Sequence, residues 1–347
     1  MSILNNTTSH KSISLVALLL LSVLTGLITI PAASAVNETN SGIISGTETW
    51  TGTMNLNGDV LVAEGAQLIV NAGTTINIPF GNYIDVEGAI CIGDVSCGSS
   101  SGSSSNQARF VWSLPTDYTP VGRCYTNNTN NPNYNGDTGC GSGMVIRSTI
   151  DQALTSIKYA HFENAYGLPF DTSQVSGKQY GVLVFDGSST TATGLSFENI
   201  NTSNILALDL ASPLISDSTF TNGVDGNGYD AAAVRGYGAG AGILGTMRIQ
   251  DSVFTGDNEP GCQGQDGRTV IHVENSYIDL SRLEIKDNSL GVYLKLSSGS
   301  LTNSTIDVKC NGIDTNSHKV TGTINHTLYL NDNTITTEEG AGITAYD

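Results

Sequence analysis

A loose repeat in the second half of the chain limits its fold more than any other feature. From about residue 153 onward, phrases such as SIKYAHFEN (156–164), TGLSFENI (193–200) and RIQDSVFTG (248–256) place one large apolar residue in the same slot. Successive slots lie 35, 23, 34, 31, 21 and 29 residues apart. The residues in this slot are Phe162, Phe197, Phe220, Phe254, Ile285, Ile306 and Ile335.

These spacings predict a three-sided β-solenoid whose minimal coil has about 21–23 residues, with insertions that lengthen some coils. One coil cannot bury its apolar row alone, but stacked coils align their rows into a continuous core. We therefore expect the Phe and Ile column to be core and not an aromatic binding strip. Asn164, Asn199 and Asn222 each follow the phenylalanine by two residues. Because Asn tolerates the left-handed backbone of a tight corner, these residues predict a stacked structural ladder, with glycan contact as the alternative.

The first half of the chain also contains short alternating segments. Between Asp59 and Cys91 these are VLVA, QLIVNA, TTINIP and YIDVEGAI, separated by Gly65, Gly73 and Gly81. The block from Trp50 through YIDVEGAI resembles the opening coils of right-handed parallel β-helix surface proteins, and the later phrases resemble their generic repeat. Such proteins share with pectate lyases a fold of three parallel sheets. The resemblance covers most of residues 48–347 and implies an all-β fold, but the same fold carries lyases, hydrolases, adhesins and inert stalks.

Residues 92–145 interrupt the pattern. Their Ser-, Asn- and Gly-rich stretches bracket ARFVWSLP (108–115), which we interpret as one strand. We expect long disulfide-braced loops that leave one corner of the β-helix, and we expect a binding surface here, because loops of this length tend to be functional or disordered. Just beyond them, the spacing of apolar residues allows a single helical turn at 151–154.

The N-terminus has the features of a secretory signal. Lys11 precedes an apolar run from Ser14 to Ile30, and Ala33-Ser34-Ala35 supplies the small residues of a cleavage site. An uncleaved signal anchor is the alternative. We predict a signal peptide at 1–35, a β-helix at 36–347, no membrane span after cleavage, and an extracellular or cell-surface location. The formal net charge of −18 argues against nucleic acid and anionic lipid as partners.

The six cysteines all follow the predicted signal, and in an oxidising compartment they predict disulfides. Sequence proximity favours Cys91–Cys97 and Cys124–Cys140, which leaves Cys262–Cys310. A zinc site is the alternative, but the chain has no C-x-x-C motif. Sequons predict a glycosylated exterior at Asn37, Asn127, Asn201, Asn303 and Asn325.

Catalytic motifs are missing from the sequence. We find none of the acidic pairs, G-H-G, W-x-D-H or R-x-P-x-x-R phrases of polysaccharide-cleaving β-helices, and we predict no catalytic residue. The histidines after the predicted signal (His161, His272, His318 and His326) are scattered singly, so we interpret each as structural.

Two polar clusters remain. Asp225, Asn227 and Asp230 offer three oxygen side chains and partly resemble a calcium loop, with a polar turn as the alternative. Strand alternation would place Arg268, His272 and Glu274 on one side of a strand. That face would hold the acid/base group if the protein were an enzyme, but a solvated strand face beside Cys262 is the favoured interpretation.

The sequence therefore predicts a secreted or surface β-helix without catalytic activity, serving as an adhesin, a glycan-binding module or an envelope component. Polysaccharide or other surface proteins would be its partners, and calcium its only candidate cofactor. A carbohydrate-active enzyme, either a polysaccharide lyase or a glycoside hydrolase, is the alternative. The last coil runs from Leu328 to Ile343 without a polar cap, so we expect that the chain continues or that a partner covers this end.

Overall fold

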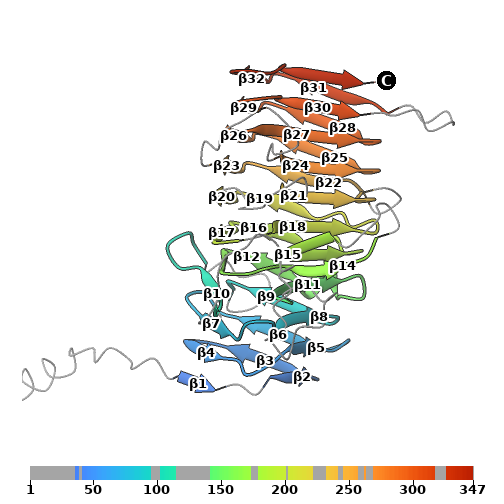
Figure 1. Cartoon of the computed structure of the whole chain (residues 1–347). Helices are drawn as coiled ribbons and strands as arrows, with labels where there is room; N and C mark the ends of the chain where they lie inside the picture. The colour runs from blue at the N-terminus through green and yellow to red at the C-terminus, as the bar shows by residue number, and fades with distance from the viewer. Residues whose placement is uncertain are drawn as a thin grey trace, which may run out of the picture. The chain divides into compact units, whose positions relative to one another are not determined.

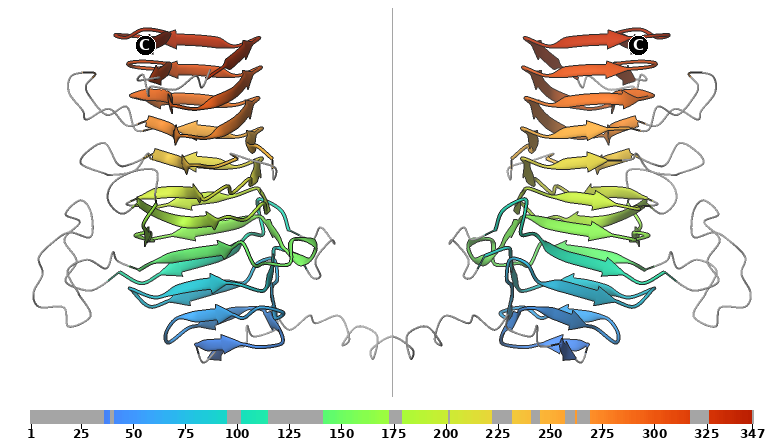
Figure 2. Two further views of the ribbon diagram at one scale, coloured as in Figure 1. Left: turned by 90° about the vertical axis from the view of Figure 1, so that its right-hand side faces the viewer. Right: turned by 90° about the vertical axis from the view of Figure 1, so that its left-hand side faces the viewer.

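The computed structural model describes residues 36–38, 41–94, 102–114, 141–172, 179–200, 202–221, 232–240, 245–256, 262, 269–316 and 326–346. The predicted signal peptide lies outside these residues. The compact unit Asn37–Asp347 is a right-handed parallel β-helix, as the repeat predicted. Figures 1 and 2 show its coils stacked one on another, from β2–β5 at one end to β31–β33 at the other.

Each coil contributes one strand to each of three parallel sheets. Sheet A contains β1 (Val36–Glu38), β4 (Thr53–Asn55), β7 (Thr75–Ile78), β10 (Ala108–Trp112), β13 (Ala160–Glu163), β17 (Ser196–Glu198), β20 (Thr219–Thr221), β23 (Val253–Thr255), β26 (Glu284–Asn288), β29 (Thr305–Val308) and β32 (Thr334–Thr337). Sheet B contains β2 (Gly42–Ile44), β5 (Val60–Val62), β8 (Tyr83–Val86), β11 (Gly143–Arg147), β15 (Gln179–Asp186), β18 (Ser203–Leu208), β21 (Ala232–Tyr237), β24 (Thr269–Glu274), β27 (Leu290–Lys295), β30 (Ile313–Asn316) and β33 (Ile343–Tyr346). Sheet C contains β3 (Thr47–Trp50), β6 (Gln67–Val70), β9 (Ala89–Ile92), β12 (Ser156–Lys158), β16 (Thr191–Thr193), β19 (Leu214–Ser216), β22 (Met247–Gln250), β25 (Tyr277–Ser281), β28 (Ser298–Thr302) and β31 (Leu328–Asn331).

The aromatic slot of the repeat forms a stack inside sheet A. Phe162, Phe197, Phe220 and Phe254 are in register on successive strands and nearly fully buried, with neighbouring ring centroids 4.5–5.3 Å apart. Phe110 on β10 adds a further ring, 5.3 Å from Phe162. Because side chains alternate along a strand, the residues on either side of each phenylalanine point outward. The expectation that this column is core is confirmed.

Sheet B differs because parts of its outer face are also covered. The short strand β14 (Leu168–Phe170) pairs antiparallel with β15. Leu168 belongs to a second apolar cluster with Val184, Leu206, Leu208 and Tyr237, separate from the main core. Strand β18 is accordingly buried at all six positions. The outer faces of β15 and β18 are therefore largely buried.

Tight corners fall where Gly and Asn predicted them. Gly65, Gly73 and Gly81 adopt φ of 79°, 74° and 79°. Asn164 and Asn199 have φ of 61° and 54°, and Asn199 Nδ2 donates to Asn164 Oδ1 at 3.2 Å, so the two residues form the expected ladder. Asn222 lies outside the described residues.

The interpretation of ARFVWSLP as one strand is confirmed by β10, which lies in the body of sheet A between β7 and β13. The expected disulfide-braced loops on either side of it stay a prediction, because residues 95–101 and 115–140 lie outside the described residues. The apolar alternation of Ala108, Phe110 and Trp112, all fully buried, fills the same inward slots as in neighbouring coils. The helical turn is confirmed as the 3₁₀ helix η1 (Gln152–Leu154), which Asp151 caps by accepting from the Ala153 amide.

Cys262 and Cys310 form a disulfide, as predicted. Cys91 is also disulfide-bonded, but its partner lies outside the described residues, as do Cys97, Cys124 and Cys140. In the last coil, Tyr329, Leu330 and Ile343 are exposed. The expected cover of this end stays a prediction.

Candidate functional site

The outer face of sheet A carries a cluster of polar side chains on three neighbouring strands. Parallel pairing places Arg109 of β10 beside His161 of β13, and His161 beside Ser196 of β17. The same register places Glu163 beside Glu198. We call His161, Glu163 and Glu198 the HEE cluster.

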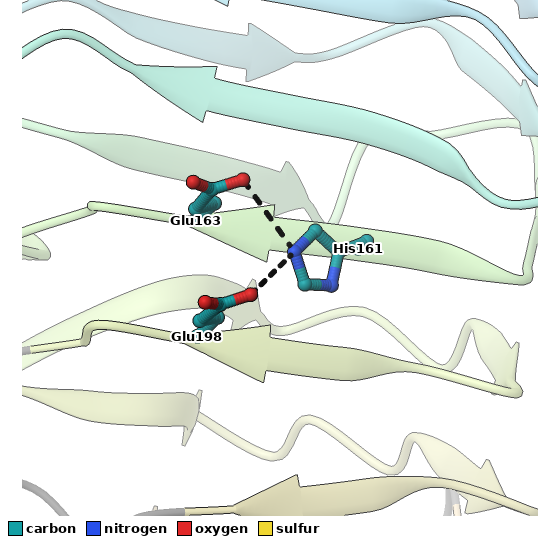
Figure 3. Close-up of side chains that lie close together, drawn as sticks. All are labelled: His161, Glu163 and Glu198. Carbon is teal, nitrogen blue, oxygen red and sulfur yellow. Dashed lines mark ion pairs between the residues drawn. The ribbon is translucent and has the colours of Figure 1, made fainter.

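The imidazole of His161 lies between the two carboxylates (Figure 3). Its Nε2 is 3.7 Å from Glu163 Oε2 and 3.6 Å from Glu198 Oε2. The three atoms that could hold a metal ion lie within 4.8 Å of one another. The His161 side chain is 12% exposed, and its Nε2 is buried with no hydrogen-bond partner among the described residues. Glu198 lies on the solvent-exposed side of the cluster, with 56% of its side chain exposed.

A chain of hydrogen bonds fixes the other ring nitrogen of His161. Gln107 Nε2 donates to the carbonyl oxygen of Gly194 at 3.2 Å, so the amide oxygen of Gln107 faces Ser196. Ser196 Oγ donates to this oxygen at 3.0 Å. The hydroxyl has only one proton, so at the 2.8 Å contact with His161 it accepts from Nδ1–H. In the neutral ring, Nε2 therefore presents a lone pair to the two carboxylates.

Arg109 supplies the positive charge of this region. Its Nη2 lies 2.6 Å from Glu163 Oε2, and half of its side chain is exposed. Burial lowers the pKa of His161 below its ordinary value, the charge of Arg109 acts in the same direction, and the carboxylates of Glu163 and Glu198 offset only part of this shift. A lowered pKa favours the neutral ring, in which the proton on Nδ1 leaves Nε2 unprotonated.

A polar cleft adjoins the cluster. It has a volume of about 340 Å³ and is lined by residues 104–107 together with Gly73, Arg109 and His161. The lining side chains are hydroxyls, amides, a guanidinium and an imidazole. Part of the interrupted region thus contributes to a concave surface beside the HEE cluster.

A second histidine–glutamate pair lies on sheet B. His272 and Glu274 share one face of β24, as strand alternation predicted, with Nε2 and Oε1 3.0 Å apart. The expected solvated face is wrong, because Glu274 is only 6% exposed. The ring of Tyr293 packs 4.7 Å from that of His272, and Lys295 Nζ contacts Glu274 Oε2 at 2.8 Å. Arg268 lies outside the described residues.

Most other predicted sites lie outside the described residues. Asp225, Asn227 and Asp230, the candidate calcium ligands, lie outside the described residues, as do the sequons at Asn127, Asn201 and Asn325. Asn37 lies in β1. Asn303 is exposed at a corner with φ of 51°, an accessible position for a glycan, and its glycosylation stays a prediction.

Sequence reasoning missed the HEE cluster because each histidine was considered alone. A signal was present: Glu163 and Glu198 each follow a phenylalanine of the repeat slot, and His161 and Ser196 each precede one. Alignment of that slot would have placed all four residues on one face of adjacent strands.

The chain matches no protein-family model and no curated protein. It is similar to a solved structure, the enzymatically active domain of tailspike protein 2 of bacteriophage CBA120, with 12% identity and a TM-score of 0.21. The match covers 86% of this chain and 39% of that one. Among the described residues, no helix is long and apolar enough to cross a membrane.

Proposed function

We propose that this protein is a secreted or cell-surface β-helix that binds a polysaccharide in the cleft beside sheet A. The observation that carries the proposal is the chemistry of this cleft. Ser104, Ser105, Asn106, Gln107 and Arg109 offer hydroxyl, amide and guanidinium groups, which match the hydroxyl-rich surface of a sugar. The volume of about 340 Å³ lies within the ~300–1,000 Å³ of typical ligand sites.

Two further features support this function. Arg109 and His161 lie on strands of the β-helix, so part of the cleft is held on a rigid scaffold. The Cys262–Cys310 disulfide favours an oxidising compartment, in agreement with the predicted signal peptide.

A carbohydrate-cleaving enzyme is the second candidate, and one observation favours it. The carboxylate oxygens of Glu163 and Glu198 lie within 4.8 Å of each other, and retaining glycosidases use two carboxyl groups about 5–5.5 Å apart. Arg109, however, already pairs with Glu163. We therefore place binding ahead of cleavage.

A panel of neutral and acidic polysaccharides tests the proposal with two measurements on the same samples: binding to the immobilised glycan and release of reducing or unsaturated ends. We expect saturable binding without new ends. Asn106→Ala should weaken binding about tenfold through loss of one side-chain contact, whereas Thr334→Ala, an exposed position on β32 of the same sheet, should leave it unchanged. If the protein releases new ends and Glu198→Gln abolishes this release, the protein is a carbohydrate-cleaving enzyme. Equal binding by the Asn106→Ala and Thr334→Ala variants would show that the cleft does not bind the polysaccharide.

A further inference from the structure

We propose that the HEE cluster is a binding site for a first-row divalent metal ion, with Zn²⁺ as the best-fitting probe. His161 would bind through Nε2, and Glu163 and Glu198 through their Oε2 atoms. This inference does not depend on glycan binding.

The first argument is the convergence of electron-pair donors. The Gln107–Ser196–His161 chain directs the Nε2 lone pair of the neutral ring toward the two carboxylates. Among the described residues, no group donates a hydrogen bond to this nitrogen. Two anionic oxygens and one buried lone pair within 4.8 Å are an arrangement that a cation would stabilise.

The second argument is distance. Donor atoms bound to one Zn²⁺ at about 2.1 Å in tetrahedral geometry lie about 3.4 Å apart. The observed separations from His161 Nε2 are 3.7 Å to Glu163 and 3.6 Å to Glu198. Shifts of a few tenths of an ångström would therefore complete two sides of such a site. Glu198, being more than half exposed, can make such a shift without disturbing the core.

The donor set indicates which ion would bind. One imidazole with two carboxylates suits Zn²⁺ and similar first-row ions, whereas Ca²⁺ and Mg²⁺ prefer oxygen ligands alone. Three protein ligands leave a fourth position, and His161 also lines the polar cleft. Ser196 and Gln107 act as positioning residues, since they hold the tautomer and the orientation of the ring.

Arg109 competes with the metal. Its guanidinium neutralises Glu163 through the same Oε2 atom that faces His161. Half of the Arg109 side chain is exposed, so it can leave this position. Removal of Arg109 should therefore strengthen metal binding, an effect that a purely structural ion-pair network would not show.

The test is a Zn²⁺ titration of the purified untagged protein, stripped with a chelator and followed by calorimetry, with Co²⁺ absorption as an independent signal of nitrogen and oxygen ligation. Glu198→Gln and His161→Gln should each lower the affinity by more than tenfold, and Ser196→Ala by about tenfold. Arg109→Ala should raise it. The matched control is Glu284→Gln, which changes an exposed carboxylate of β26 on the same sheet that is paired with Lys286, and it should leave the affinity unchanged.

Glu198 is exposed, so its variant should fold, and circular dichroism checks this for every variant. No Zn²⁺ binding by the wild-type protein, equal affinity of the Glu198→Gln and Glu284→Gln variants, or a preference for Ca²⁺ over Zn²⁺ would overturn the proposal.

Discussion

The four-residue pattern His–apolar–Glu–Asn occurs in two regions of this β-helix, with different results. On sheet A it is His161 to Asn164, and on sheet B it is His272 to Asn275. In both, the apolar residue is fully buried and the Asn turns a left-handed corner, with φ of 61° and 49°.

The difference lies in the neighbouring coils. On sheet A the next coil brings a second carboxylate, Glu198, to the histidine. On sheet B the next coil brings Lys295, which contacts the glutamate itself, and the histidine completes a hydrogen bond with that glutamate. The same local sequence thus faces a second, exposed carboxylate in one region, beside the Arg109–Glu163 pair, and forms a closed ion-pair network in the other. In a solenoid, residues 20–35 positions away decide what a strand's outer face can do.

The largest expected effect concerns the buried residue of each pattern. Phe162→Ala should lower the free energy of unfolding by about 3–5 kcal/mol, because it opens a cavity in the aromatic stack. Val273→Ala on sheet B should cost about 2 kcal/mol, since fewer buried carbons are removed. Guanidinium unfolding measures both. Equal costs would mean that the aromatic stack contributes no more than an aliphatic core.

The next prediction compares the stability contributions of Glu274 on sheet B and Glu198 on sheet A. Glu274→Gln should destabilise the protein by about 2 kcal/mol, because it leaves Lys295 and His272 without their ionic partner; the partial exposure of Lys295 keeps the loss below that of a fully buried pair. Glu198→Gln should change stability by no more than about 0.5 kcal/mol, since it removes an exposed carboxylate that faces another acceptor. Similar losses of stability in both variants would show that Glu198 of sheet A is as firmly paired as Glu274 of sheet B.

The pH dependence of stability should have a contribution from sheet B. Burial lowers the pKa of His272 below its ordinary value, with Arg235 and Lys295 acting in the same direction and Glu274 against them; the ring of Tyr293 also packs on it. Burial also opposes ionisation of Glu274, but its hydrogen bonds with His272 and Lys295 outweigh this and lower its pKa.

The pKa values of His272 and Glu274 are both lower in the folded chain, so the unfolded chain binds more protons than the folded chain. Stability should therefore decrease as the pH falls below about 6.5, the ordinary histidine pKa, and decrease further where Glu274 takes up a proton. His272→Gln should flatten this dependence between about pH 7 and pH 5 in unfolding measurements. A variant with the unchanged wild-type slope would show that His272 does not titrate differently in the two states.

The smallest difference between the two regions is expected at the corners. Asn164→Ala and Asn275→Ala should each cost about 1 kcal/mol, because alanine tolerates a left-handed backbone less well, and Asn164→Ala should cost slightly more because it also removes the hydrogen bond from Asn199. Asn→Gly at either position should cost less than Asn→Ala, because glycine adopts this conformation freely. Thermal unfolding of the four variants compares the corners directly, and a marked inequality would show that they also contribute to what distinguishes the two sites.

Much of the fold could be predicted from the sequence, because its determinants recur. The phenylalanine slot predicted the inward column of sheet A, and the Gly and Asn positions predicted corners such as Gly65 and Asn199. The place of β10 in the body of sheet A was not predicted, because the polar stretches around it hid one coil within an irregular interval.

The candidate site was harder to predict for a physical reason. Coil lengths vary, so the 35 residues from Glu163 to Glu198 carry no visible period unless the phenylalanines are aligned first. The Gln107–Ser196–His161 chain depends on where the segment before β10 lies, which no repeat encodes. The pair His272 and Glu274 was found because it is local, but its burial depends on Tyr293 and Lys295 of the next coil.

The most direct test of this contrast is a crystal structure of the protein grown with Zn²⁺ and measured at the zinc absorption edge. We expect an anomalous peak between His161 Nε2 and the carboxylates of Glu163 and Glu198, with no peak at His272 and Glu274. A map with no peak at the HEE cluster, or with one at the sheet B pair, would contradict it.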